Sequence, residues 1–140
     1  MDTSHFSEHL QQTVSLAQEA AQHYQTNYVG TEHILLAMMC VTESTASRLL
    51  IASGASIERY RELFRRCLQH DSPTHGFTPR TKQIFELARE YALNESRRLE
   101  AITGTEHVLL AILTRSECVG AKMLESIGVD IEELNRRTEE

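Results

Sequence analysis

The chain has 140 residues, enough for one ordinary domain, and 41% of them are hydrophobic, which favours a packed core over disorder. Its net charge of −6 argues against a nucleic acid as partner, because phosphate backbones repel an acidic surface. No run approaches the roughly 20 apolar residues that cross a bilayer, so we expect no membrane contact. The three cysteines form no CxxC pair, and we expect a reducing, cytoplasmic setting.

The sequence contains an internal duplication. The segment Gly30–Ala37 (GTEHILLA) recurs 74 residues later as Gly104–Ala111 (GTEHVLLA). Around it, Tyr28–Glu58 aligns without a gap with Ile102–Glu132, and 12 of the 31 pairs are identical. Upstream the offset becomes 71, so the second copy carries three extra residues within Asn94–Thr103. An alignment of this quality predicts two copies of one structural unit.

We expect residues 1–140 to form a single domain. The first repeat is predicted over about 6–70 and the second over about 77–138. The linker between them, about 71–76, belongs to a segment rich in turn-forming residues, HDSPTHG. Two such copies should pack about a pseudo-twofold axis and present each surface feature twice.

Each copy is predicted to contain four helices. The first helix follows Ser7 in copy one and Thr78 in copy two, and both residues are good N-caps. Pro79 then takes the first helical position, where its missing N–H costs nothing. The apolar residues of the first helix in copy one keep the spacing of a single helix face: Leu10, Val14, Ala17, Ala21 and Tyr24.

The second helix is predicted to begin at an N-cap threonine, Thr31 or Thr105, and is so apolar that we expect it at the centre of the core. The third is expected to end at Gly54 or Gly128, which suit a left-handed C-terminal residue. The fourth begins at a capping residue in each copy, Ser56 and Asp130. Alternating β-branched runs are absent, so we expect no strands. The predicted fold is all-α: a tandem duplication of a four-helix repeat forming one eight-helix, pseudo-twofold domain.

Two glutamates, Glu32 and Glu106, fall in the first turn of the second helix of each copy. Their carboxylates have one of two roles. Either they only complement the helix dipole, or the rigid start of the helix positions them to bind a cationic group of a partner. The helix starts at Ser7 and Thr78 suit an anion, because free N–H groups and the dipole point there. If each cap lies beside one glutamate, a ligand that carries both charges has two matching sites.

Metal and enzymatic chemistry find little support in the sequence. His33 and His107 have no second ligand at metal-binding spacing, so we expect no metal and structural imidazoles that bond a neighbouring backbone group. Phosphate-cradling and nucleophile motifs do not occur, so we expect no enzymatic activity in this chain. A small helical enzyme or metal protein built on the two histidines is the weakest alternative.

The doubled pattern F-S/T…LA-x-E-A…GTEH-I/V-LLA resembles the Clp N-terminal repeat domain of Clp/Hsp100 AAA+ unfoldases, from Phe6 to about Arg137. It looks more like the ClpC branch than ClpA or ClpB, although Ser7 stands where a threonine is more usual. The resemblance implies a substrate- and adaptor-docking module of an ATP-dependent Clp protease unfoldase. The partners it implies are adaptors of the MecA type, protein substrates and, through the parent protein, the ClpP peptidase.

In the ClpC branch this domain also recognises phosphoarginine-marked proteins. The resemblance implies that Glu32 and Glu106 hold the guanidinium and that Ser7 and Thr78 lie near the phosphate. It implies no cofactor in this domain, since ATP and Mg²⁺ belong to ATPase domains that assemble the parent hexamer, and a monomeric isolated domain. We expect a fragment of a longer unfoldase; a free-standing Clp-repeat regulatory protein that binds the Clp machine is the alternative.

Overall fold

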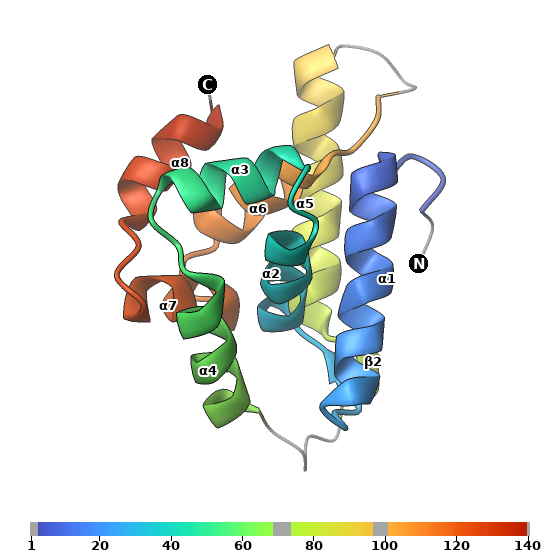
Figure 1. The fold of residues 1–140 in the computed structure, drawn as a ribbon. Helices are drawn as coiled ribbons and strands as arrows, with labels where there is room; N and C mark the ends of the chain where they lie inside the picture. The colour runs from blue at the N-terminus through green and yellow to red at the C-terminus, as the bar shows by residue number, and fades with distance from the viewer. Residues whose placement is uncertain (1–2, 69–73, 97–100, 140) are drawn as a thin grey trace.

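A computed structural model describes residues 3–68, 74–96 and 101–139 of the chain. Within these residues the chain forms eight helices and two very short strands (Figure 1). In chain order they are α1 (Glu8–His23), β1 (Tyr28–Val29), α2 (Thr31–Cys40), α3 (Thr45–Ala52), α4 (Ile57–Cys67), β2 (Gly76–Phe77), α5 (Pro79–Ser96), α6 (Thr105–Thr114), α7 (Val119–Ser126) and α8 (Ile131–Glu139).

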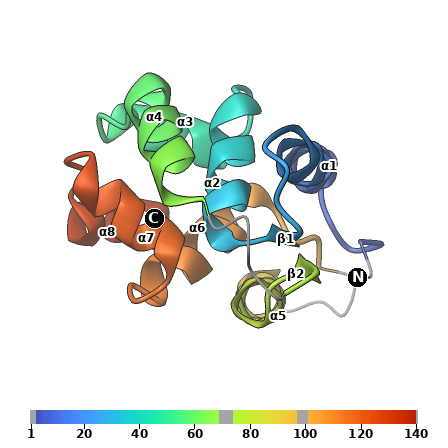
Figure 2. The same cartoon turned by 90° about the horizontal axis from the view of Figure 1, so that it is seen from below.

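The two repeats interlock rather than sit side by side. In each repeat the long first helix packs on the apolar second helix, α1 on α2 and α5 on α6. The second helices also reach across, since α2 contacts α7 and α6 contacts α3. Seen end-on, α1 and α5 lie on the same side of the molecule with the two short strands between them (Figure 2). The domain therefore has one core to which both repeats contribute.

The second helices form the centre of that core, as predicted. Every residue of α2 from Thr31 to Met39 is buried, and Leu35 and Met38 are fully inaccessible. In α6, Leu109 and Ile112 are buried to the same degree. Truncating one such side chain to alanine should cost about 2–5 kcal/mol, because a cavity remains where the side chain was.

Most of the predicted helix boundaries are confirmed. Ser7 Oγ accepts the Leu10 N–H at 3.1 Å, and Thr78 Oγ1 accepts the Thr81 N–H at the same distance. The third helix of each copy is followed by a left-handed glycine, with φ of +87° at Gly54 and +94° at Gly128. The predicted caps of the fourth helices also accept first-turn N–H groups: Ser56 and Asp130.

The prediction of no strands was wrong. β1 and β2 pair in parallel, Tyr28 opposite Gly76 and Val29 opposite Phe77. An isolated parallel bridge joins Phe6 to Thr103 in the symmetry-related place. Two residues are too few to show the period-two pattern of a strand, and each segment pairs with the other repeat, so local sequence carries no signal. These pairings place the start of each repeat beside the GTEH motif of the other.

Part of the predicted linker and of the predicted three-residue insertion lies outside the described residues. Gly76, the last residue of that linker, begins β2, and α5 extends to Ser96. In the described ranges no single helix is long and apolar enough to cross a membrane; α2 and α3 reach the required length only together, and they meet at 92°.

Candidate functional site

The GTEH motifs begin their helices with glycine at the N-cap. Gly30 and Gly104 are the N-caps of α2 and α6. In each motif the histidine Nδ1 accepts the glycine N–H, at 3.0 Å for His33 and 2.9 Å for His107. With Nδ1 accepting, the proton of the neutral imidazole sits on Nε2. The prediction that both histidines are structural and bond a neighbouring backbone group is confirmed.

The prediction that Thr31 and Thr105 are N-caps of their own helices was wrong. Thr31 Oγ1 accepts the N–H of Gly120 at 2.9 Å, and Thr105 Oγ1 accepts the N–H of Ala46 at 3.2 Å. Those N–H groups lie in the first turns of α7 and α3, where a helix has no partners of its own for them. Each threonine thus caps a helix of the opposite repeat.

Both ring nitrogens of each histidine are engaged within the protein. His33 Nε2 lies 3.1 Å from Thr26 Oγ1, and His107 Nε2 lies 2.8 Å from Glu95 Oε2. Burial lowers the pKa of His33 to about 4, so its ring is neutral at physiological pH. Across the described ranges, no three His, Cys, Asp or Glu side chains gather where they can hold a metal ion.

The carboxylate of Glu32 is held in a confined position. It folds back over the Cα of Gly30, so that a Cβ there would collide with Oε1. Only 6% of the residue is exposed, and this burial raises the pKa of its carboxyl group. The N–H of Glu32 itself and the hydroxyl of Tyr28, which donates to Oε2 at 3.4 Å, act in the opposite direction. A cationic partner stabilises the ionised form of such a buried carboxylate, because it replaces the solvation that burial removes.

The structure brings Glu32 and Thr78 together. Both line a cavity of about 330 Å³, here called the carboxylate cavity, between the GTEH motif of the first repeat and the start of α5 in the second. The Thr78 N–H donates to Val29 O at 3.1 Å, which fixes the start of α5 beside this motif. One glutamate and one helix start therefore face the same space, as the sequence hypothesis requires.

Two further charged residues line the carboxylate cavity, and the sequence analysis missed both. Arg80 Nη1 pairs with Glu117 Oε1 at 2.6 Å, and the two side chains are 42% and 54% exposed. A backbone hydrogen bond at Glu117, with the Arg80 guanidinium second, holds the pKa of Glu117 below its usual value. The sequence did contain a signal for Arg80. It stands two residues after the cap Thr78 and therefore in the first turn of α5, beside the predicted anion-binding helix start.

The second pair of predicted residues, Ser7 and Glu106, occupies the symmetry-related position. Ser7 N donates to Thr103 O at 2.8 Å, so the start of α1 lies beside the strand-like segment that leads into the second GTEH motif. The Glu106 side chain is 36% exposed, and Ile102 replaces Tyr28 before the motif. The two copies of the motif are thus alike in backbone and unlike in the burial of their carboxylates.

The fold and its paired sites define a helical domain of two interlocked repeats with a charged cavity at the repeat interface. The chain belongs to the Clp repeat (R) N-terminal domain family, which it matches over residues 5–92 and 76–140. The predicted family and the all-α tandem-repeat fold are confirmed.

The chain matches a small part of much longer proteins. It is 35% identical over 130 residues to the negative regulator of genetic competence ClpC/MecB of Bacillus subtilis, covering 90% of the chain and 16% of that protein. It is 37% identical over 134 residues to the ATP-dependent Clp protease ATP-binding subunit ClpA homolog of Cyanidium caldarium, covering 92% and 15%. The chain thus spans about one sixth of the length of these relatives.

Solved structures share the fold at low sequence identity. The N-terminal domain of ClpD from Arabidopsis thaliana matches with a TM-score of 0.78 and 20% identity, covering 98% of this chain and 96% of that one. A complex of the ClpV N-domain with a VipB peptide matches with a TM-score of 0.76 and 17% identity, covering 96% and 85%. In that complex a ClpV N-domain binds a VipB peptide.

Proposed function

We propose that this chain is the substrate- and adaptor-docking module of a ClpC-like, ATP-dependent unfoldase, and that its carboxylate cavity receives phosphoarginine side chains. Its chemistry is reversible binding, with no catalysis of its own, in the cytoplasm. Adaptors of the MecA type and the ClpP peptidase are the partners of the parent hexamer in this proposal. The observation that carries it is the meeting of the Glu32 carboxylate with the start of α5 in one cavity.

The cavity offers complementary charge at its two ends. A guanidinium group suits Glu32, because an arginine fork can donate two parallel hydrogen bonds to one carboxylate. A phosphate suits the N-terminus of α5, where the helix dipole, the Thr78 hydroxyl and the Arg80 guanidinium lie together. Phosphoarginine carries both groups within one side chain.

Arg80 has to change partners for such a ligand to bind. Its present partner, Glu117, is held in an exposed ion pair, which contributes little stability because water screens it. A phosphate at the start of α5 has a larger charge and more acceptor oxygens than the Glu117 carboxylate. The exchange of Glu117 for phosphate therefore favours the bound state.

The test is calorimetric titration of the 140-residue chain with free phosphoarginine, with arginine and phosphoserine as controls. We expect binding of phosphoarginine alone, with no measurable heat from either control, because each lacks one of the two charged groups. Glu32→Gln and Thr78→Val should each weaken binding at least about tenfold, since each removes a charged or polar contact.

Glu106→Gln is the matched control, because it changes the same motif position in the other repeat. It should remove the second site and leave binding at the carboxylate cavity unchanged. No heat with a folded wild-type domain would overturn phosphoarginine recognition, and Glu32 would then be a helix-start charge only. Docking of protein adaptors would be tested separately, by titration with a MecA-type adaptor.

A further inference from the structure

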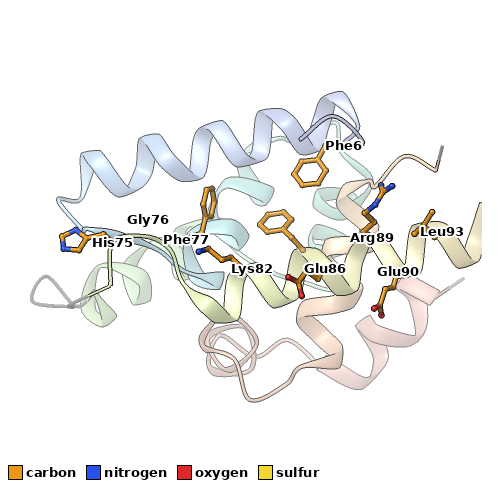
Figure 3. Close-up of a pocket in the computed structure, with 10 residues that line it drawn as sticks. Phe6, His75, Gly76, Phe77, Lys82, Glu86, Arg89, Glu90 and Leu93 are labelled. Atoms are coloured by element: carbon orange, nitrogen blue, oxygen red, sulfur yellow. The ribbon is translucent and has the colours of Figure 1, made fainter. Parts of the chain in front are cut away.

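The start of α1 is fixed beside the second GTEH motif. Thr103 N donates to His5 O at 2.7 Å, and Ser7 N donates to Thr103 O at 2.8 Å. Phe6, between these two bonds, is buried and stacks on Phe85 of α5 with ring centroids 5.5 Å apart (Figure 3). The first turn of α1 therefore stands towards the second motif as the first turn of α5 stands towards the first motif.

The second motif also holds its carboxylate in the same orientation. The side chain of Glu106 folds back over the Cα of Gly104, as Glu32 folds back over Gly30. The space between Glu106 and the start of α1 is here called the second GTEH site. It is the symmetry-related counterpart of the carboxylate cavity.

The two sites differ in the cation at the helix start. With the offset of 71, Ser7–Glu8–His9 corresponds to Thr78–Pro79–Arg80, so His9 takes the place of the arginine that lines the carboxylate cavity. A guanidinium group is charged at every physiological pH, whereas histidine is the side chain that changes its charge between pH 5 and 8. The second site has a titratable group where the first has a permanent cation.

The imidazole of His9 has no partner within the domain. It is half-buried on the second residue of α1, and neither ring nitrogen forms a hydrogen bond or an ion pair within the described part of the chain. In His33 and His107, by contrast, both ring nitrogens are engaged. His9 is thus placed to contact an anion that binds at the start of α1.

The elements packed around the start of α1 are α2, α5, α6 and the turn before α3. Together with the N-terminal segment they carry six charged or titratable side chains near this end of the domain: His5, Glu8, Glu43, Arg89, Glu95 and Glu106. Most of them are acids, and the cation among them, Arg89, has its Nη1 inaccessible to water. A phosphate at this helix start is therefore repelled by its surroundings unless His9 carries a proton.

We propose that the second GTEH site binds a phosphorylated guanidinium group only when His9 is protonated. The guanidinium pairs with Glu106, and the phosphate accepts hydrogen bonds from the His9 imidazolium and from first-turn N–H groups of α1. The domain then holds one phosphoarginine side chain at alkaline pH and two in mild acid. This inference rests on the proposed function, because it takes the same ligand.

Single-site variants separate the two sites in the test. Glu106→Gln leaves the carboxylate cavity alone, and Glu32→Gln leaves the second GTEH site alone. Each is titrated calorimetrically with phosphoarginine at pH 8, 7 and 6. The ligand's own titration affects both variants alike, so the ratio of their affinities reports on the sites.

We expect the affinity of Glu32→Gln to rise at least about tenfold from pH 8 to pH 6, relative to that of Glu106→Gln. A charged donor in place of a neutral one accounts for a factor of this size. The affinity of Glu106→Gln should not rise, because Arg80 is charged throughout. Burial raises the pKa of Glu32, so that carboxylate can only lose charge as the pH falls.

Exchanging the two cations tests the role of His9 directly. His9→Arg, added to Glu32→Gln, should give tight binding at pH 8 and remove the gain in mild acid. Arg80→His, added to Glu106→Gln, should weaken binding more at pH 8 than at pH 6. Circular dichroism melts check that each variant is folded.

Three results would overturn this inference and leave the proposed function in place. They are equal affinity of Glu32→Gln at pH 8 and pH 6, an unchanged pH dependence after His9→Arg, and binding by Glu106→Gln alone at every pH. No heat from the wild-type domain at any pH would instead overturn the proposed recognition of phosphoarginine, and this inference with it.

Discussion

Tyr60 donates its hydroxyl to the backbone carbonyl of Glu32 at 2.8 Å, joining α4 to the first turn of α2. Tyr60 is fully buried, and burial, with the nearby Glu32 charge second, raises its pKa well above the ordinary value. The hydroxyl therefore stays protonated and remains a donor at all physiological pH values. The corresponding residue of the second repeat is Leu134, which cannot make this bond.

Tyr60→Phe should lower the free energy of unfolding by about 1 kcal/mol, because it removes one buried hydrogen bond and keeps the ring. Urea denaturation followed by circular dichroism measures the change. Tyr91→Phe is the matched control: its hydroxyl bonds Thr114 Oγ1 at an exposed position, so its removal should change stability little. Equal losses in the two variants would contradict the importance of the Tyr60 bond.

Glu32→Gln should stabilise the domain at pH 7 while weakening the proposed binding of phosphoarginine. Because burial raises the pKa of Glu32 in the folded state, the ionised carboxylate opposes folding, increasingly so as pH rises through that pKa. The neutral amide removes this penalty, and we expect a gain of about 1 kcal/mol, or roughly 3 °C in Tm. Glu106→Gln, at the more exposed position, should leave Tm nearly unchanged in the same scanning calorimetry. A Glu32→Gln domain less stable than wild type would show that the carboxylate supports the fold.

The His33 imidazole should make the domain sensitive to mild acid. Its pKa is about 4 in the folded state against an ordinary 6.5, so the unfolded chain binds the extra proton first. The stability it contributes is complete above about pH 6.5 and is lost as pH falls towards 4, on the order of 3 kcal/mol in all. Urea titrations from pH 7 to 4 measure this loss.

His33→Asn replaces the imidazole with a side chain that does not titrate in that range. The variant should be less stable at pH 7, yet its stability should fall less between pH 6.5 and 4. If the two pH profiles run parallel, groups other than His33 cause the acid sensitivity.

Thr31→Val and Thr105→Val should each cost about 1 kcal/mol, because each leaves a first-turn N–H of the other repeat without its cap. Thr31→Ser keeps the hydroxyl and should retain most of the stability. Denaturant midpoints compare the three variants. A Thr31→Val domain as stable as Thr31→Ser would mean that the hydroxyl contributes nothing to the fold.

Features set by neighbours along the chain could be predicted from the sequence. The caps Ser7, Thr78 and Ser56 each accept the N–H of the residue three positions further on, so the local sequence pattern was sufficient to predict them. Thr31 has the same local appearance, yet its hydroxyl serves Gly120, 89 residues further on. Pattern reasoning therefore found the right residue type and assigned it to the wrong helix.

The sequence predicted which residues form the candidate site. It did not predict that the two glutamates differ in burial. The repeated motif pointed to Glu32 and Glu106 alike, but their burial depends on residues outside the motif, such as Tyr28 and its counterpart Ile102. The ion pair joins Arg80 on α5 to Glu117, 37 residues further on in the turn between α6 and α7, and no local spacing reveals it.

The covalent joining of the two repeats removes a constraint that identical subunits would impose. In a symmetric dimer of single repeats, Tyr60 and Leu134 would have to be the same residue, and so would Arg80 and His9. Within one polypeptide each position can differ from its counterpart while the shared backbone pairings, such as Tyr28 with Gly76, hold the halves together. The domain can therefore offer different binding chemistry on its two halves without giving up the symmetric framework that folds it.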